Sequence, residues 1–295
     1  ITMSCAKAGP HWNKNLPKFD TTAVELSPYP FSDAAESSTP PSRRRRLEAF
    51  PQSSITLHNG THIASAAATN LKYLLSIQPD DLLYAWRRNA GLSQPANARP
   101  LRGWESPGSE LRGHVLGHWL SAASLCYAST RNPRIKARID GVLAALSECE
   151  ASLGGTGWLA AFPESFLERV ENLIPVWAPY YTTHKLLQGL LDVHEIIGGS
   201  EPLRLALKLA RYIQRRISSL LTKTSIEHHW TTLNKEFGGL NDVLWKLHQH
   251  QQRSAAAAGS SKMQADDALA VAPAGLQLRA LASHFDRPCL LGPLA

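Results

Sequence analysis

Two histidines four residues apart open an apolar stretch of the sequence. In "ELRGHVLGHWLSA" they are His114 and His118, and a helix there would place both imidazoles on one face. A zinc-protease helix of the H-E-x-x-H type also needs a glutamate directly after the first histidine. Here the three intervening residues are Val, Leu and Gly, so the general base is missing and a zinc protease is excluded. Glu105, Glu110 and Arg112 crowd the same helix entrance, which favours a pocket wall, while two helix histidines without a chemical role remain the alternative.

A second polar cluster lies in "VWAPYYTTHKLL", where two tyrosines precede a predicted helix cap at Thr182 or Thr183. That cap would leave His184 and Lys185 in the first turn, where a cation opposes the helix macrodipole. A locally unfavourable residue indicates a functional site or an acidic partner. The alternative is that the tyrosines, Tyr181 among them, are core aromatics and that the lysine reaches past them to solvent.

A third cluster is "LNKEFGGLNDVLW", in which Glu236 precedes a glycine pair. Asn241 and Asp242 are predicted to cap the following helix. Capping does not explain Glu236, nor the two glycines, which let the backbone approach another surface closely.

The three clusters together carry the groups that a carbohydrate pocket needs. Aromatic faces stack on sugar C–H groups, and paired carboxylates act as acid and base or nucleophile. The entries at residues 114, 184 and 241 are each about one helix pair apart, so we expect them to converge on one pocket; the alternative is that each set only caps its own helix. The predicted substrate-binding residues are Glu105, His114, His118, Tyr181, His184, Glu236 and Asn241, with no catalytic or metal-ligating residue assigned in this chain.

The elements that position these residues are predicted to be helices. Asn132 is a predicted N-cap, with Pro133 at the first helical position of a helix ending near residue 153. Further helices are expected at 68–77, 80–92, 113–130, 182–199, 200–221, 239–252 and 275–286. Pro133 and Pro202 lie 69 residues apart and each opens the second helix of a pair, and strand alternation is almost absent.

Repeated helix pairs bury their apolar faces against neighbouring pairs, which gives an open solenoid or a closed α/α toroid. The segments between the pairs are long and rich in Trp, Tyr, Glu and His, which favours an enzyme whose loops line one mouth of a closed barrel. The predicted fold class is therefore all-α, an α/α toroid.

The flanking and inserted segments differ in composition. Residues 1–50 are predicted to be a disordered leader, and residues 251–275 a low-complexity surface insertion within the domain at 51–295. The net charge is +7, but the run Arg43 to Arg46 is interpreted as a solvated tail and acids and bases are mixed beyond it, so no nucleic-acid partner is expected. No apolar stretch is long enough for a membrane helix. Four widely spaced cysteines support neither disulfides nor a structural zinc site.

The motifs in this order resemble glycoside hydrolase family 127, the β-L-arabinofuranosidase-like family, in its plant-type branch. The resemblance is carried by "GWE", "ELRGHVLGHWLSA", "GWLAAFPESFLERVE", "VWAPYYTTHKLLQGLLD", "SIEHHWTTLNKEFGGLND" and "HFDRPCLLGPLA", and it spans about residues 53 to 295. It implies an (α/α)6 barrel that hydrolyses arabinose-containing glycans with retention. The sequence has Lys235 where plant-type relatives usually have Glu.

The resemblance also implies a catalytic centre. In characterised members the nucleophile is a cysteine held on a zinc ion by cysteines and a glutamate, and another glutamate is the acid/base. Those residues are expected downstream of the "GPLA" segment, and Cys289 matches none of the ligand cysteines. We therefore expect an incomplete barrel with about eight of twelve helices, inactive alone and without its own zinc. The partner is expected to be an arabinose-containing glycan.

Two further expectations concern the class and location of the protein. The alternative function is a non-catalytic helical-repeat module that presents aromatic loops to a glycan or protein. The chain begins with Ile and shows no signal-peptide pattern, so its start is expected to be incomplete. The sequence does not decide its location, although the resemblance points to the secretory pathway or the cell exterior.

Overall fold

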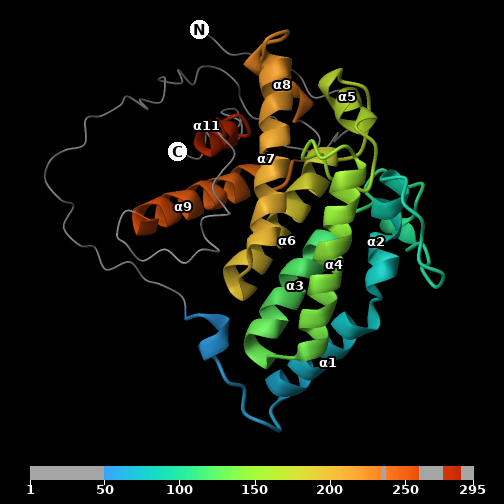
Figure 1. The fold of residues 1–295 in the computed structure, drawn as a ribbon, viewed down its shortest axis with the longest axis vertical. Helices are drawn as coiled ribbons and strands as arrows, with labels where there is room; N and C mark the ends of the chain where they lie inside the picture. Colours follow the sequence, from blue (N-terminus) through green and yellow to red (C-terminus); the bar gives the residue numbers. More distant parts are fainter. Residues whose placement is uncertain (1–49, 234–236, 259–274, 287–295) are drawn as a thin grey trace, which may run out of the picture. The chain divides into compact units, whose positions relative to one another are not determined.

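The computed structural model describes residues 50–233, 237–258 and 275–286, and for residues 256–258 only the backbone. Within these ranges the structure is helical and contains no strand, as predicted (Figure 1). Residues 52–286 form one compact unit. None of the described helices is both long enough and apolar enough to cross a bilayer. The predicted leader lies outside the described residues apart from Phe50, and most of the predicted insertion lies outside them too.

The described helices are joined by connections of different lengths. In order they are η1 (Gln52–Ser54), α1 (His62–Ser76), α2 (Pro79–Asn89), η2 (Gly103–Glu105), α3 (His114–Thr130), α4 (Pro133–Ser152), α5 (Ser165–Glu171), α6 (Pro179–Ile197), α7 (Ser200–Leu221), α8 (Ile226–Thr232), α9 (Leu240–Ala258) and α11 (Leu278–Ser283).

Helix α4 begins where the sequence predicted. The side chain of Asn132 accepts hydrogen bonds from the backbone N–H groups of Arg134 and Ile135, and Pro133 occupies the first turn. Pro is favoured there because its missing N–H would have no helical partner. Apolar side chains that recur every three or four residues along α4 are buried in the core: Ile135, Ile139, Val142, Leu143 and Leu146.

Helix α6 begins earlier than predicted. Its first residue is Pro179, and the N-cap is Ala178, a left-handed residue whose side chain makes no capping bond. The predicted cap at Thr182 or Thr183 is wrong, because both hydroxyls donate to carbonyls one turn back inside the helix. Threonine can make this backward bond as readily as it can cap. The predicted first-turn residues of α6 therefore lie in its second turn.

Helix α7 has the predicted bounds, whereas α9 begins differently from the prediction. Ser200 is the first residue of α7, and Gly199 is its N-cap. Asn241 and Asp242 lie within the first turn of α9, so the prediction that they cap it is wrong. Helix α9 continues to Ala258, past residue 251, because alanine-rich sequence favours helix over loop.

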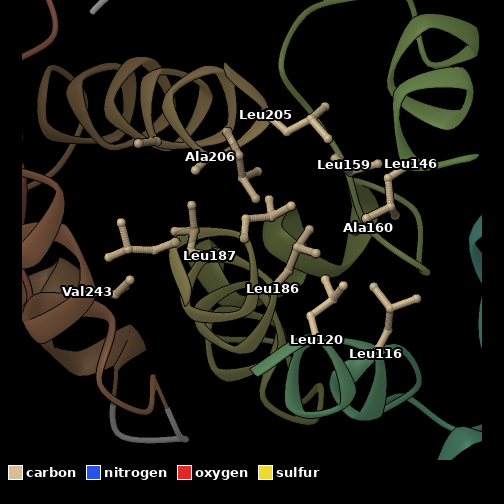
Figure 2. Packing of buried hydrophobic residues seen from close by; sticks show 14 of the residues in the cluster. Leu116, Leu120, Leu146, Leu159, Ala160, Leu186, Leu187, Leu205, Ala206 and Val243 are labelled. Atoms are coloured by element: carbon tan, nitrogen blue, oxygen red, sulfur yellow. The ribbon is translucent and has the colours of Figure 1, made fainter. Parts of the chain in front are cut away.

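The helix pairs form an inner and an outer row. Helices α3, α6 and α9 contact each other in sequence, while their partners α4, α7 and α11 pack outside them and α4 contacts α7. This alternation is the arrangement of an α/α barrel. Leucines from both rows meet between the helices, as Figure 2 shows for Leu116 and Leu120 of α3, Leu186 and Leu187 of α6, and Leu205 of α7.

Helices α3 and α6 approach each other at the level of the backbone. A Cβ on Gly117 would overlap the carbonyl oxygen of Lys185, and a Cβ on Gly189 would lie 2.6 Å from the carbonyl oxygen of Gly117. Real Cβ atoms essentially never come this close. The two glycines therefore allow a contact that no other residue permits, and it fixes the spacing of the two helix starts that carry the histidines.

Candidate functional site

The carboxylate of Glu105 caps the start of α3. Oε2 accepts the backbone N–H of Gly113 at 2.7 Å and Oε1 accepts that of Val115 at 3.0 Å. Gly113 has a φ of +101°, and a Cβ there would lie 2.7 Å from the Cβ of Ala161. An anion at a helix N-terminus is stabilised by the helix dipole and by these N–H groups. Through these two hydrogen bonds, the "GWE" turn (η2) is fixed against the start of α3, where His114 is the first residue.

The same carboxylate pairs with His114, which is 7% exposed. Its Nδ1 lies 2.5 Å from Oε1 of Glu105 and 3.0 Å from the carbonyl oxygen of Leu111, so Nδ1 carries a proton. Burial opposes protonation of the ring, but the hydrogen bond to Glu105 and its charge outweigh burial and raise the pKa of His114. With Nδ1 committed, Nε2 is the nitrogen left to meet a ligand.

Rings from α3 and α6 gather around His114. The centroid of its ring lies 6.0 Å from that of His118 and 6.3 Å from that of Tyr181. Tyr181 in turn lies 6.3 Å from His184, and the Nζ atom of Lys185 lies 4.9 Å from the tyrosine ring centroid. We call these five residues together with Glu105 the ring cluster.

His184 is enclosed by the glycine pair that precedes α9. A Cβ on Gly238 would lie 2.5 Å from Nδ1 of His184, so glycine is required for the close approach that the sequence predicted. Nδ1 is buried and has no hydrogen-bond partner in the described part of the chain. Burial, together with the charge of Lys185, lowers the pKa of His184 to about 4. Its imidazole is therefore neutral at pH 7.

His118 is more exposed than the other two histidines. Burial and the charges of Lys185 and His114 lower its pKa, so it too is neutral near pH 7. The ring cluster thus combines one histidine whose pKa is raised, two neutral histidines and the cation of Lys185. Each neutral imidazole offers one donor and one acceptor, which suits hydroxyl groups.

Two tryptophans that the sequence reasoning did not select adjoin this cluster. The ring of Trp104 lies 6.4 Å from His114 and meets Trp177 edge to face at 6.2 Å. Both residues are exposed, and both lie in the aromatic-rich segments between the helix pairs. Their exposure depends on tertiary packing, which the sequence does not show. Only their position in loops rich in Trp, Tyr, Glu and His could have marked them as candidate binding residues.

The structure brings together five of the seven predicted residues: Glu105, His114, His118, Tyr181 and His184. Glu236 lies outside the described residues. Asn241 begins α9 near the glycine pair, where its amide donates to Asp286 at 2.8 Å. In the described ranges no ring contact or hydrogen bond joins Asn241 to the other five. The role of all seven in binding stays a prediction.

A cavity of about 580 Å³ lies elsewhere, between α5, α7 and α8. Its floor is an ion pair in which Nε of Arg216 donates to Glu171 at 2.5 Å and Nη1 donates to the hydroxyl of Tyr212. His228 donates from Nε2 to the carbonyl oxygen of Glu171 at 2.7 Å. These bonds tie three helices together and leave the floor satisfied, so we assign this cavity a structural role.

The described cysteines do not fit a zinc centre. Cys126 and Cys149 are buried, and burial raises the pKa of the Cys149 thiol to about 11. The described ranges contain no group of three or more His, Cys, Asp or Glu side chains placed to hold a metal. No catalytic step is therefore assigned through zinc, and its place in the complete domain stays a prediction.

Comparison with known proteins agrees with the motifs. Residues 54–262 match the family model described as Beta-L-arabinofuranosidase, GH127 catalytic domain. No curated protein matches the chain significantly. The family match covers well over half of the 295 residues and includes the described ring cluster. The chain therefore belongs to the GH127 catalytic-domain family of glycoside hydrolases.

Proposed function

We propose that the ring cluster is part of the sugar-binding wall of a hydrolase that acts on L-arabinofuranosides. The observation that carries the proposal is the joined set of Glu105, His114, Tyr181 and His184 at the N-terminal ends of two helices in backbone contact. This set lies within the region that matches a carbohydrate-active family. We further propose that residues 51–295 are the N-terminal portion of the barrel and do not hydrolyse glycans alone.

The described residues suit binding and orientation of a furanose. His114 presents Nε2 to a sugar hydroxyl, because its Nδ1 is held by Glu105. His118 and His184 are neutral, and His184 presents only Nε2, because its Nδ1 is buried against Gly238. The face of Tyr181 packs on ring C–H groups. Glu105 acts on the sugar only through His114, because its oxygens are occupied by the start of α3. We assign the nucleophile and the acid/base to none of these residues.

The proposal is tested by measuring the binding of methyl β-L-arabinofuranoside to the 295-residue chain with isothermal titration calorimetry. We expect His184→Ala and His114→Ala each to weaken binding about tenfold, because each loses hydrogen bonds worth roughly 1.4 kcal/mol. The matched control is His248→Ala on α9, whose ring packs on Trp245 instead.

Thermal melts of the same variants separate a binding defect from unfolding. The control should bind like the parent chain. Unchanged affinity in both His184→Ala and His114→Ala, with the parent chain binding the glycoside, would overturn the assignment of the wall.

A further inference from the structure

The two tryptophans next to the ring cluster expose much of their surface. Trp104 is 64% exposed and Trp177 is 44% exposed, although tryptophan is among the side chains with most to gain from burial. They come from two separate loops and meet edge to face at 6.2 Å. Since the ring of Trp104 lies 6.4 Å from that of His114, the two tryptophans adjoin the ring cluster.

The loop that carries Trp177 is held in a specific shape. The backbone N–H of Trp177 donates to Oε2 of Glu110 at 2.9 Å, and Nη1 of Arg169 donates to the other oxygen of that carboxylate at 2.7 Å. Arg169 also donates to the carbonyl of Pro175 in the same loop. These bonds fix the loop between α5 and α6, so the exposed ring is presented by an ordered segment.

The backbone of this loop is also strained. Leu173 and Ala178 adopt left-handed conformations, with φ of +59° and +47°, and neither is glycine. Such conformations persist only where surrounding contacts impose them, and they concentrate at binding sites. Leu173 directly follows the C-cap of α5, where a left-handed residue commonly ends a helix, so only the conformation of Ala178, the residue after Trp177, bears on the exposed ring.

The geometry points to a second sugar subsite, formed by Trp104 and Trp177, for the sugar residue adjoining the one held by the ring cluster. This inference rests on the proposed function. The expected ligand is a neutral sugar ring, because the platform is aromatic and Glu110, the carboxylate that binds the backbone of Trp177, is paired with Arg169. Aromatic faces bind such rings through their C–H groups.

The test compares two ligands that differ by one ring. Methyl β-L-arabinofuranoside fills only the ring cluster, while the methyl glycoside of β-L-arabinofuranosyl-L-arabinofuranose also reaches the tryptophans. We expect the 295-residue chain to bind the disaccharide about tenfold more tightly, which corresponds to roughly 1.4 kcal/mol. In Trp177→Ala this preference should vanish while monosaccharide affinity is kept, and Trp177→Phe should restore most of it.

Nuclear magnetic resonance reports the contact directly. The indole N–H signals of the two tryptophans, assigned by Trp104→Phe and Trp177→Phe, should shift with the disaccharide and hardly with the monosaccharide. Tyr73→Ala is the control, because Tyr73 is a 61% exposed aromatic on α1 outside the ring cluster. It should keep the full preference for the disaccharide.

Three outcomes would overturn the inference. Equal affinity of the parent chain for both ligands would show that there is no second subsite, and the proposed function would still stand. Equal loss of both ligands in Trp177→Ala places that tryptophan under the first sugar instead. Failure of the parent chain to bind either ligand overturns the proposed function, and the inference with it.

Discussion

Glu105 does two jobs with one carboxylate, since it caps α3 and holds the proton on His114. The pair is nearly buried, with both side chains 9% exposed. Removing its charge should therefore act on the titration of the histidine as well as on the helix start.

In Glu105→Gln the pKa of His114 should fall below its usual value. Burial and the charge of Lys185 would then act without the opposing carboxylate. The midpoint can be followed by the Cε1–H signal of His114 in a pH titration. Glu148→Gln, an exposed carboxylate that pairs with Arg87, is the control and should leave the midpoint unchanged. An unaltered midpoint in Glu105→Gln would contradict the pairing.

His229 should make the stability of the fold depend on pH. It is fully buried between Tyr180 and Phe285, and burial, with the charge of His284, lowers its pKa to about 4. The unfolded chain protonates this histidine near pH 6.5 and the folded chain does not, so stability is full above 6.5 and falls as the pH drops toward 4. The loss is on the order of 3 kcal/mol.

Urea unfolding at pH 7.5, 5.5 and 4 measures this loss. In His229→Leu the decline between pH 6.5 and 4 should be smaller by the contribution of one histidine. His184 contributes in the same direction and remains in the variant. Identical pH profiles for the parent chain and the variant would show that His229 does not titrate as described.

At this scale the sequence predicted which residue types meet, but not how each is bonded. Tyr181 and His184 were predicted from a cluster of polar and aromatic residues near a helix start, and their rings do contact each other. The bonds of Thr183 and Asn241 were mispredicted because the same side chain can cap a helix, bond backward within it or bond to a distant segment. That choice is made by tertiary neighbours such as Asp286, which the local sequence does not contain.

At the scale of elements, the contact between α3 and α6 should tolerate no side chain at its two glycines. We predict that Gly117→Ala destabilises the fold by about 3 kcal/mol or more, because the added methyl meets backbone that cannot move aside. Gly141→Ala is the matched control, since this glycine is in α4 and has open space around it. It should stabilise by about 0.5–1 kcal/mol through helix propensity.

Chemical denaturation of both variants gives the two free energies. Equal effects of the two substitutions would show that α3 and α6 are not in backbone contact. The sequence could predict most long helices, because Pro133, Asn132 and the leucine stripes are local signals. It did not predict α5 and α8, since seven-residue helices hold too few turns to show a period.

At the scale of the whole molecule, the sequence predicted helix pairs, and the structure confirms an inner and an outer row. The close approach of α3 and α6 was not predicted, because a single glycine in a helix does not reveal its partner. Whether the barrel closes depends on the helices that we propose to follow this chain.

If the chain is part of a larger barrel, apolar faces that the missing pairs would cover are open. Exposed apolar surface of this kind promotes association. We expect the 295-residue chain to bind the dye 1-anilinonaphthalene-8-sulfonate at pH 7.5 and to self-associate in sedimentation velocity. A monodisperse monomer that melts cooperatively without binding the dye would contradict the incomplete barrel and favour a solenoid.

The same proposal predicts that the chain lacks turnover. An aryl β-L-arabinofuranoside incubated with the purified chain should release no more phenol than a blank. Turnover above the blank would show that a complete catalytic set is present.

The backbone contact between α3 and α6 also bears on how this protein can change over evolutionary time. In most helix interfaces the side chains keep the two backbones apart, and each substitution of one apolar residue for another shifts the helices slightly. Here main chain rests on main chain at Gly117 and Gly189, so such exchanges elsewhere in the core cannot easily widen the gap. Substitutions elsewhere in the core should therefore hardly change the distance between His114 and His184. The outer helices and loops remain free to vary in sequence around these two histidines.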